Sequence, residues 1–196
     1  MRRLHQGAQR ASIRHRLTGV FAASVLASVA FIGVAAAPAP AAAMSSPLKD
    51  VEAYYLKLLN CTRTGGWVQK DGSCKGYGTG NYSKYVAPLR LSDGISDVAR
   101  GWARKIAIEG ACRHGDPGAR LRKAGYRGWA WGENIGCWDL RDAYQSVLNS
   151  HRQFQQEKGT GGGHWKNIKN ERYKVVGIGV WRENGHTRLV TDFYQP

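Results

Sequence analysis

The sequence predicts an α+β fold in which helices precede a closing antiparallel hairpin. Three observations support this class. Apolar residues recur at helical spacing in several segments, whereas two apolar runs near the end flank Asn184-Gly185, a strong short-range hairpin signal. The chain of 196 residues also holds 25 glycines, roughly twice the usual share, which predicts many loops and tight turns.

The first 43 residues have the three parts of a secretory signal. Residues 1–16 carry five arginines and no acid, residues 17–37 are uncharged and apolar, and residues 38–43 are alanine and proline. We expect cleavage after Ala43, with cleavage after Ala41 as the second choice. An uncleaved anchor is the alternative, because 21 uncharged residues suffice to span a bilayer. The predicted organisation is a signal peptide over 1–43 and one extracellular domain over 44–196.

Removal of the predicted signal lowers the net positive charge and so weakens the case for an anionic partner. The whole chain has a formal charge of +15, but five arginines lie in the signal, so the mature domain carries +10. These charges are spread along the sequence, which favours a solvated surface that keeps an exported protein soluble. Binding of an anionic polymer is the alternative, whereas nucleic acid is not expected as a partner. The candidate patches for a polymer are Arg120, Arg122 and Lys123, and Lys166, Lys169, Arg172 and Lys174.

The elements of the mature domain follow from local patterns, taken in chain order. Amphipathic periodicity predicts helices, Ser92-Asp93 is an N-cap signal, and glycine-rich stretches mark the breaks between elements. Residues 64–88 form a long aromatic loop that Cys74 is expected to tie down. The predicted elements are helices over 47–63, from Ser92 to about Ala107, over 117–123 and over 140–154, a strand within 129–137, and a hairpin of 175–181 and 188–194.

Four cysteines, Cys61, Cys74, Cys112 and Cys137, lie in the mature domain. An even number in an exported domain predicts two disulfides. Pairing between sequence neighbours is preferred, although four cysteines permit three pairings. A zinc–thiolate site is disfavoured, because the sequence has no C-x-x-C pair.

Two of the histidines are candidates for a functional cleft. His114 and His164 each lie beside glycine in a segment predicted to be non-helical, and glycine permits close approach of the backbone. His151 is expected at the surface of a helix, and His186 is expected to be a solvated turn residue. Glu133 lies among tryptophans, where desolvation favours pairing with a cation such as histidine.

These three residues are compatible with more than one kind of site. A disulfide between Cys112 and Cys137 would bring His114 and Glu133 within reach of each other. Two histidines and a glutamate could then form a zinc site, an acid/base pair or a structural hydrogen-bond network.

The order of short motifs resembles that of the CAP superfamily, which comprises cysteine-rich secretory proteins, antigen 5 and pathogenesis-related proteins and is also called SCP/TAPS. The resemblance covers essentially all of residues 48–196 and is of the bacterial secreted type. Gly-Glu-Asn-Ile followed by Gly-His-Trp is its most specific part. The motifs are Leu59-Asn60-x-x-Arg63, Pro88-Leu89-Arg90-Leu91, Ala99-x-x-Trp102-Ala103, Cys112-x-His114, Gly132-Glu133-Asn134-Ile135, Gly163-His164-Trp165-x-Asn167-Ile168, Val176-Gly177-x-Gly179-Val180 and Val190-Thr191-Asp192-Phe193-Tyr194.

The resemblance implies an α–β–α sandwich with a small antiparallel sheet between helices and a central cavity. It implies that His114 and His164 can hold zinc or another divalent cation and that Glu133 is a cavity acid. Some members bind sterols or fatty acids elsewhere on the domain. A second acid is usual in eukaryotic members, but Ser150 stands at that position here. Glu157 lies two helical turns further on, displaced by about 10 Å along the helix.

The function expected from these observations is that of a secreted binding module, monomeric, with a metal-capable cavity and a lipid, sterol or cell-envelope component as partner. No stable membrane span is expected after cleavage of the signal. One alternative is a metal-assisted hydrolase of peptide or cell-wall substrates, with Glu133 as the candidate catalytic base. Whether the protein is an enzyme is left open, with preference for a non-enzymatic role. The other alternative is an anionic-polymer binder.

Overall fold

The computed structural model describes residues 47–196, so the predicted signal peptide over 1–43 and its cleavage site lie outside the described residues. No helix between residues 47 and 196 combines the length and apolar character needed to cross a bilayer. The elements are α1 (Lys49–Arg63), β1 (Trp67–Val68), β2 (Cys74–Lys75), β3 (Arg90–Leu91), α2 (Asp93–Ile108), α3 (Pro117–Lys123), β4 (Ala130–Gly136), α4 (Ala143–Gln156), the 3-10 turn η1 (Glu157–Gly159), α5 (Gly163–Lys169), β5 (Val175–Glu183) and β6 (His186–Gln195).

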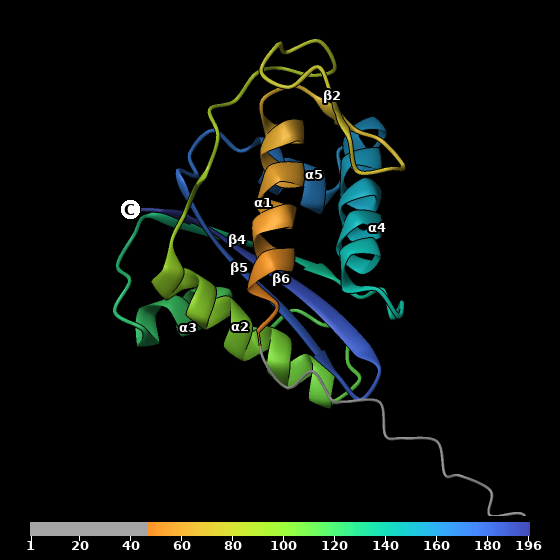
Figure 1. The fold of residues 1–196 in the computed structure, drawn as a ribbon. Helices are drawn as coiled ribbons and strands as arrows, with labels where there is room; N and C mark the ends of the chain where they lie inside the picture. Colours follow the sequence, from red (N-terminus) through yellow and green to blue (C-terminus); the bar gives the residue numbers. More distant parts are fainter. Residues whose placement is uncertain (1–46) are drawn as a thin grey trace, which may run out of the picture. The chain divides into compact units, whose positions relative to one another are not determined.

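A four-stranded sheet with the order β3-β5-β6-β4 forms the middle layer. Helices α1, α4 and α5 cover one face and α2 and α3 the other (Figure 1). The α+β class and the α–β–α sandwich are therefore confirmed. The sheet is mixed rather than purely antiparallel, because β3 pairs with β5 in parallel while the other pairs are antiparallel.

Helix α2 packs directly on strand β5 through two glycines. A Cβ atom at Gly177 would lie 2.3 Å from the backbone of Ile95, and one at Gly179 would lie 2.3 Å from the backbone nitrogen of Arg100. A side chain at either position would push the helix off the sheet. The Gly-x-Gly spacing of β5 therefore determines how closely this layer approaches the sheet.

The opposite layer contains a buried histidine. His151 of α4 is 0% exposed, so the prediction of a surface position is wrong. Its Nε2 atom lies 2.7 Å from the hydroxyl of Thr62 on α1, and its ring packs edge-on against Tyr55 with 5.7 Å between centroids. Burial lowers the pKa of His151 to about 3, so this imidazole is neutral in the folded protein.

Arg63, at the end of α1, is also buried, with 1% exposure. Its guanidinium donates hydrogen bonds to the backbone carbonyls of Ala87, Ile168, Asn170 and Tyr173. Desolvation lowers the pKa of Arg63 to about 10. The side chain thereby connects the end of α1 to the end of α5 and to two irregular segments, at Ala87 and at Tyr173.

Both disulfides are present in the neighbour pairing, Cys61–Cys74 and Cys112–Cys137. The first joins the end of α1 to β2 and ties down the loop over 64–88, within which β1 and β2 form a short antiparallel ladder. The second joins the segment after α2 to the end of β4 and is close to the two candidate histidines.

Candidate functional site

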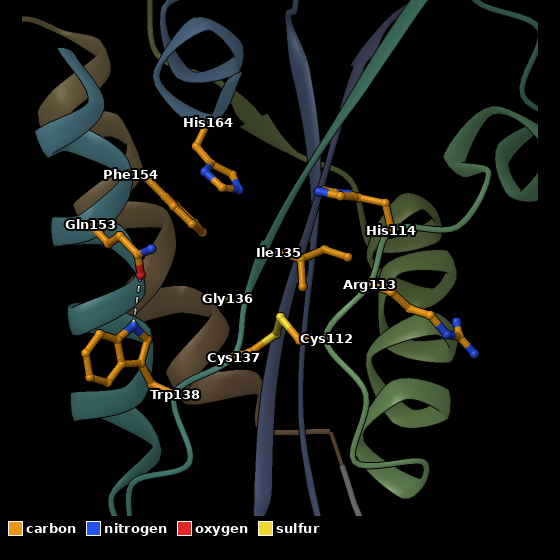
Figure 2. A pocket seen from close by; sticks show the side chains of 10 residues that line it. All are labelled: Cys112, Arg113, His114, Ile135, Gly136, Cys137, Trp138, Gln153, Phe154 and His164. Atoms are coloured by element: carbon orange, nitrogen blue, oxygen red, sulfur yellow. Dashed lines mark hydrogen bonds between the residues drawn. A yellow bond between two sulfur atoms is a disulfide. The ribbon is translucent and has the colours of Figure 1, made fainter. Parts of the chain in front are cut away.

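A pocket of about 480 Å³ lies at the edge strand β4, where the two helical layers meet. Figure 2 shows His164 entering it from α5 and His114 entering it from the segment after α2. One wall is apolar and is formed by Ile135, Phe154 and the Cys112–Cys137 disulfide. The lining residues are Cys112, Arg113, His114, Ile135, Gly136, Cys137, Trp138, Gln153, Phe154 and His164.

His114 lies two residues after the disulfide that holds this segment to β4, where the Cα atoms of Cys112 and Cys137 are 6.0 Å apart. Its Nδ1 atom lies 2.9 Å from Oε1 of Glu133, and its side chain is 57% exposed. An ionised carboxylate can only accept a hydrogen bond, so Nδ1 of a neutral His114 ring carries the proton. The Nε2 atom of His114 therefore keeps a free lone pair.

His164 is held in the same way from the opposite layer. Its Nδ1 atom lies 2.6 Å from Oε1 of Glu157, and its backbone N–H donates to Oε2 of the same carboxylate at 3.0 Å. The imidazole stacks on the ring of Phe154, with 4.3 Å between centroids and 24° between planes. Both the orientation and the tautomer of His164 are thus determined by neighbouring side chains.

The two imidazoles face each other across the pocket. Their ring centroids are 6.5 Å apart, and the planes are tilted by 31°. Because each Nδ1 atom is engaged by a carboxylate, the nitrogen left to each ring for a ligand is Nε2. Figure 2 shows the two rings pointing toward one another with the pocket between them.

Glu133 lies behind His114 and is itself almost fully covered, with a side-chain exposure of 2%. Its second oxygen is paired with Arg120 of α3, whose Nη2 atom also lies 3.6 Å from Oδ1 of Asp192. Glu133 and Asp192 are directly opposite on β4 and β6. Two buried carboxylates therefore share one arginine.

Asp192 has an unusual environment. It is 0% exposed, and neither carboxylate oxygen has a hydrogen-bond partner among residues 47–196. Desolvation raises the pKa of Asp192 to about 7, with the charge of Arg120 opposing the rise and that of Glu133 adding to it. At neutral pH Asp192 is therefore close to the midpoint between its neutral acid and its carboxylate form.

The structure brings together three of the predicted site residues, His114, His164 and Glu133. It does not place Ser150 on the pocket wall: Ser150 is 1% exposed, and its hydroxyl donates to the carbonyl of Ser146 in its own helix. His164 lies in helix α5, not in a non-helical segment as expected. His186 is not merely solvated, because its Nδ1 atom lies 2.8 Å from Asp139.

Glu157 was expected to be displaced from the site, and the structure instead places it against His164. The cause is local: α4 ends at Gln156, η1 follows, and Gly161 has a φ of +63°, so the chain reverses and α5 starts beside Glu157. The glycines over 159–163 indicated a break between elements but not the direction that the chain takes after it. Arg120 and Asp192 had no sequence signal linking them to Glu133.

The donor set for a metal ion consists of the two imidazoles. Among residues 47–196, no group of three or more His, Cys, Asp and Glu side chains is arranged to hold a metal ion. A metal-ligating histidine commonly donates its other ring N–H to a carboxylate, and both His114 and His164 have such a partner. These residues fit an open site with two protein ligands.

The fold and the pocket together define the class of this protein: an α–β–α sandwich with a pair of histidines at the edge of its sheet. The sequence model of the cysteine-rich secretory protein family, CAP, matches residues 59–193. The chain belongs to this family. A comparison with curated proteins gave no match.

Solved structures with a similar fold include CAP proteins of bacteria. A cysteine-rich secretory protein of Staphylococcus aureus is 12% identical with a TM-score of 0.51, over 76% of this chain and 39% of that one. NaASP2, solved with Zn²⁺, is 15% identical with a TM-score of 0.52, over 76% of this chain and 80% of that one. An extracellular SCP-domain protein of Bacillus anthracis is 21% identical with a TM-score of 0.47, over 57% of this chain and 35% of that one. The chain thus spans well under half the length of these two bacterial proteins.

Proposed function

We propose that this chain is an exported CAP-domain protein whose pocket binds one divalent metal ion through His114 and His164. The observation that carries the proposal is the paired orientation of the rings. Each Nδ1 atom is hydrogen-bonded to its own carboxylate, and each Nε2 atom is left for a ligand. Core packing does not account for the placement of His114, because its side chain is 57% exposed.

The separation of the rings also suits one shared ion. At a tetrahedral ion, two zinc–nitrogen bonds of about 2.1 Å each would place the ring centroids roughly 5.3 Å apart, about 1 Å closer than the 6.5 Å between them here. A small rotation of the exposed His114 would close the difference. NaASP2, which shares the fold, was solved with Zn²⁺, which agrees with a metal-binding role but does not locate an ion in this chain.

An ion held by two protein ligands keeps further coordination positions for water or a bound ligand, and it supplies a local positive charge. The chain itself supplies the surroundings of those positions. Arg113 and Gln153 line the pocket beside an apolar wall that includes Phe154. We infer that the ligand of this pocket has a polar or anionic group near the histidines and an apolar part against that wall. A sterol or lipid site elsewhere on the domain stays an expectation.

A hydrolytic role with Glu133 as general base has less support. One oxygen of Glu133 contacts His114 and the other is paired with Arg120, and its side chain is 2% exposed. A base must reach the proton that it removes. The binding function is therefore preferred.

The proposal is tested by measuring metal content and zinc affinity in the protein recovered from the culture medium of an export host. We expect about one divalent ion per chain in the parent, and loss of binding in His114→Ala and in His164→Ala. His186→Ala is the matched control, since His186 pairs with Asp139 instead of lining the pocket, and it should bind like the parent. Equal binding by the parent and His164→Ala would refute the proposal.

A further inference from the structure

One end of the central sheet gathers exposed aromatic and cationic side chains that the histidine pocket does not use. Strands β3, β4 and β5 begin at this end and β6 finishes there, as the register of Arg90 with Val175, of Val175 with Tyr194 and of Tyr194 with Trp131 shows. The C-terminus, marked in Figure 1, lies at the same end. We call this surface the Trp129 end.

Trp129 is the most exposed large hydrophobic side chain among residues 47–196, at 89%. Its backbone is nevertheless held in place, because its N–H donates to the carbonyl of Gln195 at 3.0 Å. The preceding Gly128 lies so close to β6 that a Cβ atom there would be 2.0 Å from the same carbonyl. The indole is thus presented by an anchored backbone, and little further ordering of the loop would be needed on binding.

A second indole follows two residues later, because Trp129 lies in the bend just before β4 and Trp131 is the second residue of that strand. Trp131 is 38% exposed and covers Gly118 of α3, where its ring lies 5.1 Å from the guanidinium carbon of Arg122. The two indoles thus lie two residues apart where the edge strand β4 begins, with a cation over the ring of Trp131.

Positive charge surrounds the indoles. Arg127 is fixed by hydrogen bonds to the carbonyls of Arg122 and Tyr126. Arg90 and Lys174 stand at the starts of β3 and β5, and Arg90 N–H donates to the carbonyl of Lys174. Two acids lie close to these cations: Asp116, which is 4.0 Å from Arg122, and Glu171, whose charge interacts with Lys174 and which is itself paired with Lys84. The exposed cations of this end are Arg90, Arg122, Lys123, Arg127 and Lys174.

We propose that the Trp129 end docks the protein onto an anionic lipid bilayer as a peripheral contact. An indole exposed to this degree projects from the surface, so it cannot enclose a small ligand, but it can enter the interfacial region of a bilayer, where tryptophan is favoured. The cations around it complement anionic headgroups, each contributing about fivefold to partitioning near such a surface. The protein would lie on the membrane without crossing it.

The test uses the secreted protein after its N-terminus has been determined. The protein is co-sedimented with vesicles of pure phosphatidylcholine and with vesicles that also contain 30% phosphatidylglycerol. We expect binding to the anionic vesicles only, weakening as salt is raised. Trp129→Ala should reduce partitioning at least about fivefold, as expected for removal of an interfacial aromatic anchor. Arg90→Gln combined with Lys123→Gln should reduce it roughly 20-fold. Quenching of tryptophan fluorescence by brominated lipid should fall in Trp129→Phe, with the remainder coming from Trp131.

Two variants serve as matched controls. Tyr77→Ala removes another exposed aromatic, 58% accessible, in the loop after β2. Lys57→Gln combined with Lys75→Gln removes two exposed cations from α1 and β2. Both should bind anionic vesicles like the parent.

Three results would overturn the proposal. One is unchanged vesicle binding in Trp129→Ala, and another is equal binding to neutral and anionic vesicles. The third is a protein that does not bind vesicles but does bind soluble heparin, with weaker heparin binding in Trp129→Ala. This result would assign the surface to an anionic polymer. None of these measurements involves the histidine pocket, so the metal proposal can fail or succeed independently.

Discussion

Glu157 binds His164 twice: one carboxylate oxygen lies 2.6 Å from Nδ1 of the ring, and the other accepts the backbone N–H at 3.0 Å. The same side chain thus starts helix α5 and sets the direction of its histidine. Glu133, on strand β4 of the central sheet, contacts Nδ1 of His114. The two acids differ in surroundings, since the Glu157 side chain is 24% exposed and that of Glu133 only 2%.

Replacing Glu157 is expected to weaken the proposed metal site without removing a ligand. Loss of a carboxylate that orients a ligating histidine commonly costs 10–100-fold in affinity. We predict that Glu157→Ala lowers zinc affinity by about this factor in a calorimetric titration. Glu171→Ala, which removes an exposed acid paired with Lys84, is the control. An unchanged affinity in Glu157→Ala would show that Glu157 does not orient the ligand.

The buried His151 predicts loss of stability in acid. Its pKa is about 3 in the folded protein and about 6.5 when unfolded, so the unfolded state binds the extra proton. The free energy of unfolding should therefore fall as pH decreases below about 6.5, by up to about 1.4 kcal/mol per pH unit from this group. Chemical denaturation at several pH values measures it. His151→Gln should lose this component and His186→Gln should keep it; identical pH profiles for His151→Gln and the parent would contradict the assignment.

Asp192 predicts a dependence of the opposite sign. Its folded pKa of about 7 exceeds the unfolded value of 3.8, so the folded state holds the proton more tightly. This group should lower the free energy of unfolding progressively as pH rises from about 4 to 7, after which its effect is constant. The stability of Asp192→Asn relative to the parent should accordingly increase over that interval. A difference that does not vary with pH would show that Asp192 titrates normally.

Arg63 is expected to be among the least replaceable residues of the fold. Arg63→Met would leave four carbonyl groups without their donor in a buried region. Since unsatisfied buried groups cost about 1–3 kcal/mol each before relaxation and entry of water, we expect a loss of at least about 3 kcal/mol in denaturant unfolding. Arg141→Met, at an exposed position, should change stability by less than about 0.5 kcal/mol. Similar losses in both variants would indicate a general effect of removing charge.

Local signals in the sequence were sufficient for most of the elements. The Ser92 hydroxyl does cap α2, and the Asn184-Gly185 turn does close the final hairpin. The parallel pairing of β3 with β5 was not predicted, because β3 has two residues and its position depends on a long-range partner. His151 was misplaced because a polar side chain on an amphipathic helix is counted with the solvent face, whereas here Thr62 supplies its partner in the core.

The candidate site was predictable to the extent that its residues lie in recognisable motifs. His114, His164 and Glu133 were identified, and the second disulfide was correctly expected to bring His114 near Glu133. Glu157 could not be placed, because the path of the chain through Gly161 decides whether it faces His164. Arg120 and Asp192 reach Glu133 from two other elements, and such three-element contacts leave no local trace in a sequence.

The two pocket histidines belong to opposite layers, one carried by α5 and the other by the segment that follows α2. A ligand that binds both Nε2 atoms would consequently link the two helical layers across the edge of the sheet. Its binding free energy would oppose separation of the layers, adding about 2.7 kcal/mol to folding stability at a concentration 100 times its dissociation constant. In such an arrangement, the more fully the pocket is occupied, the more strongly the two helical layers of the domain are held together.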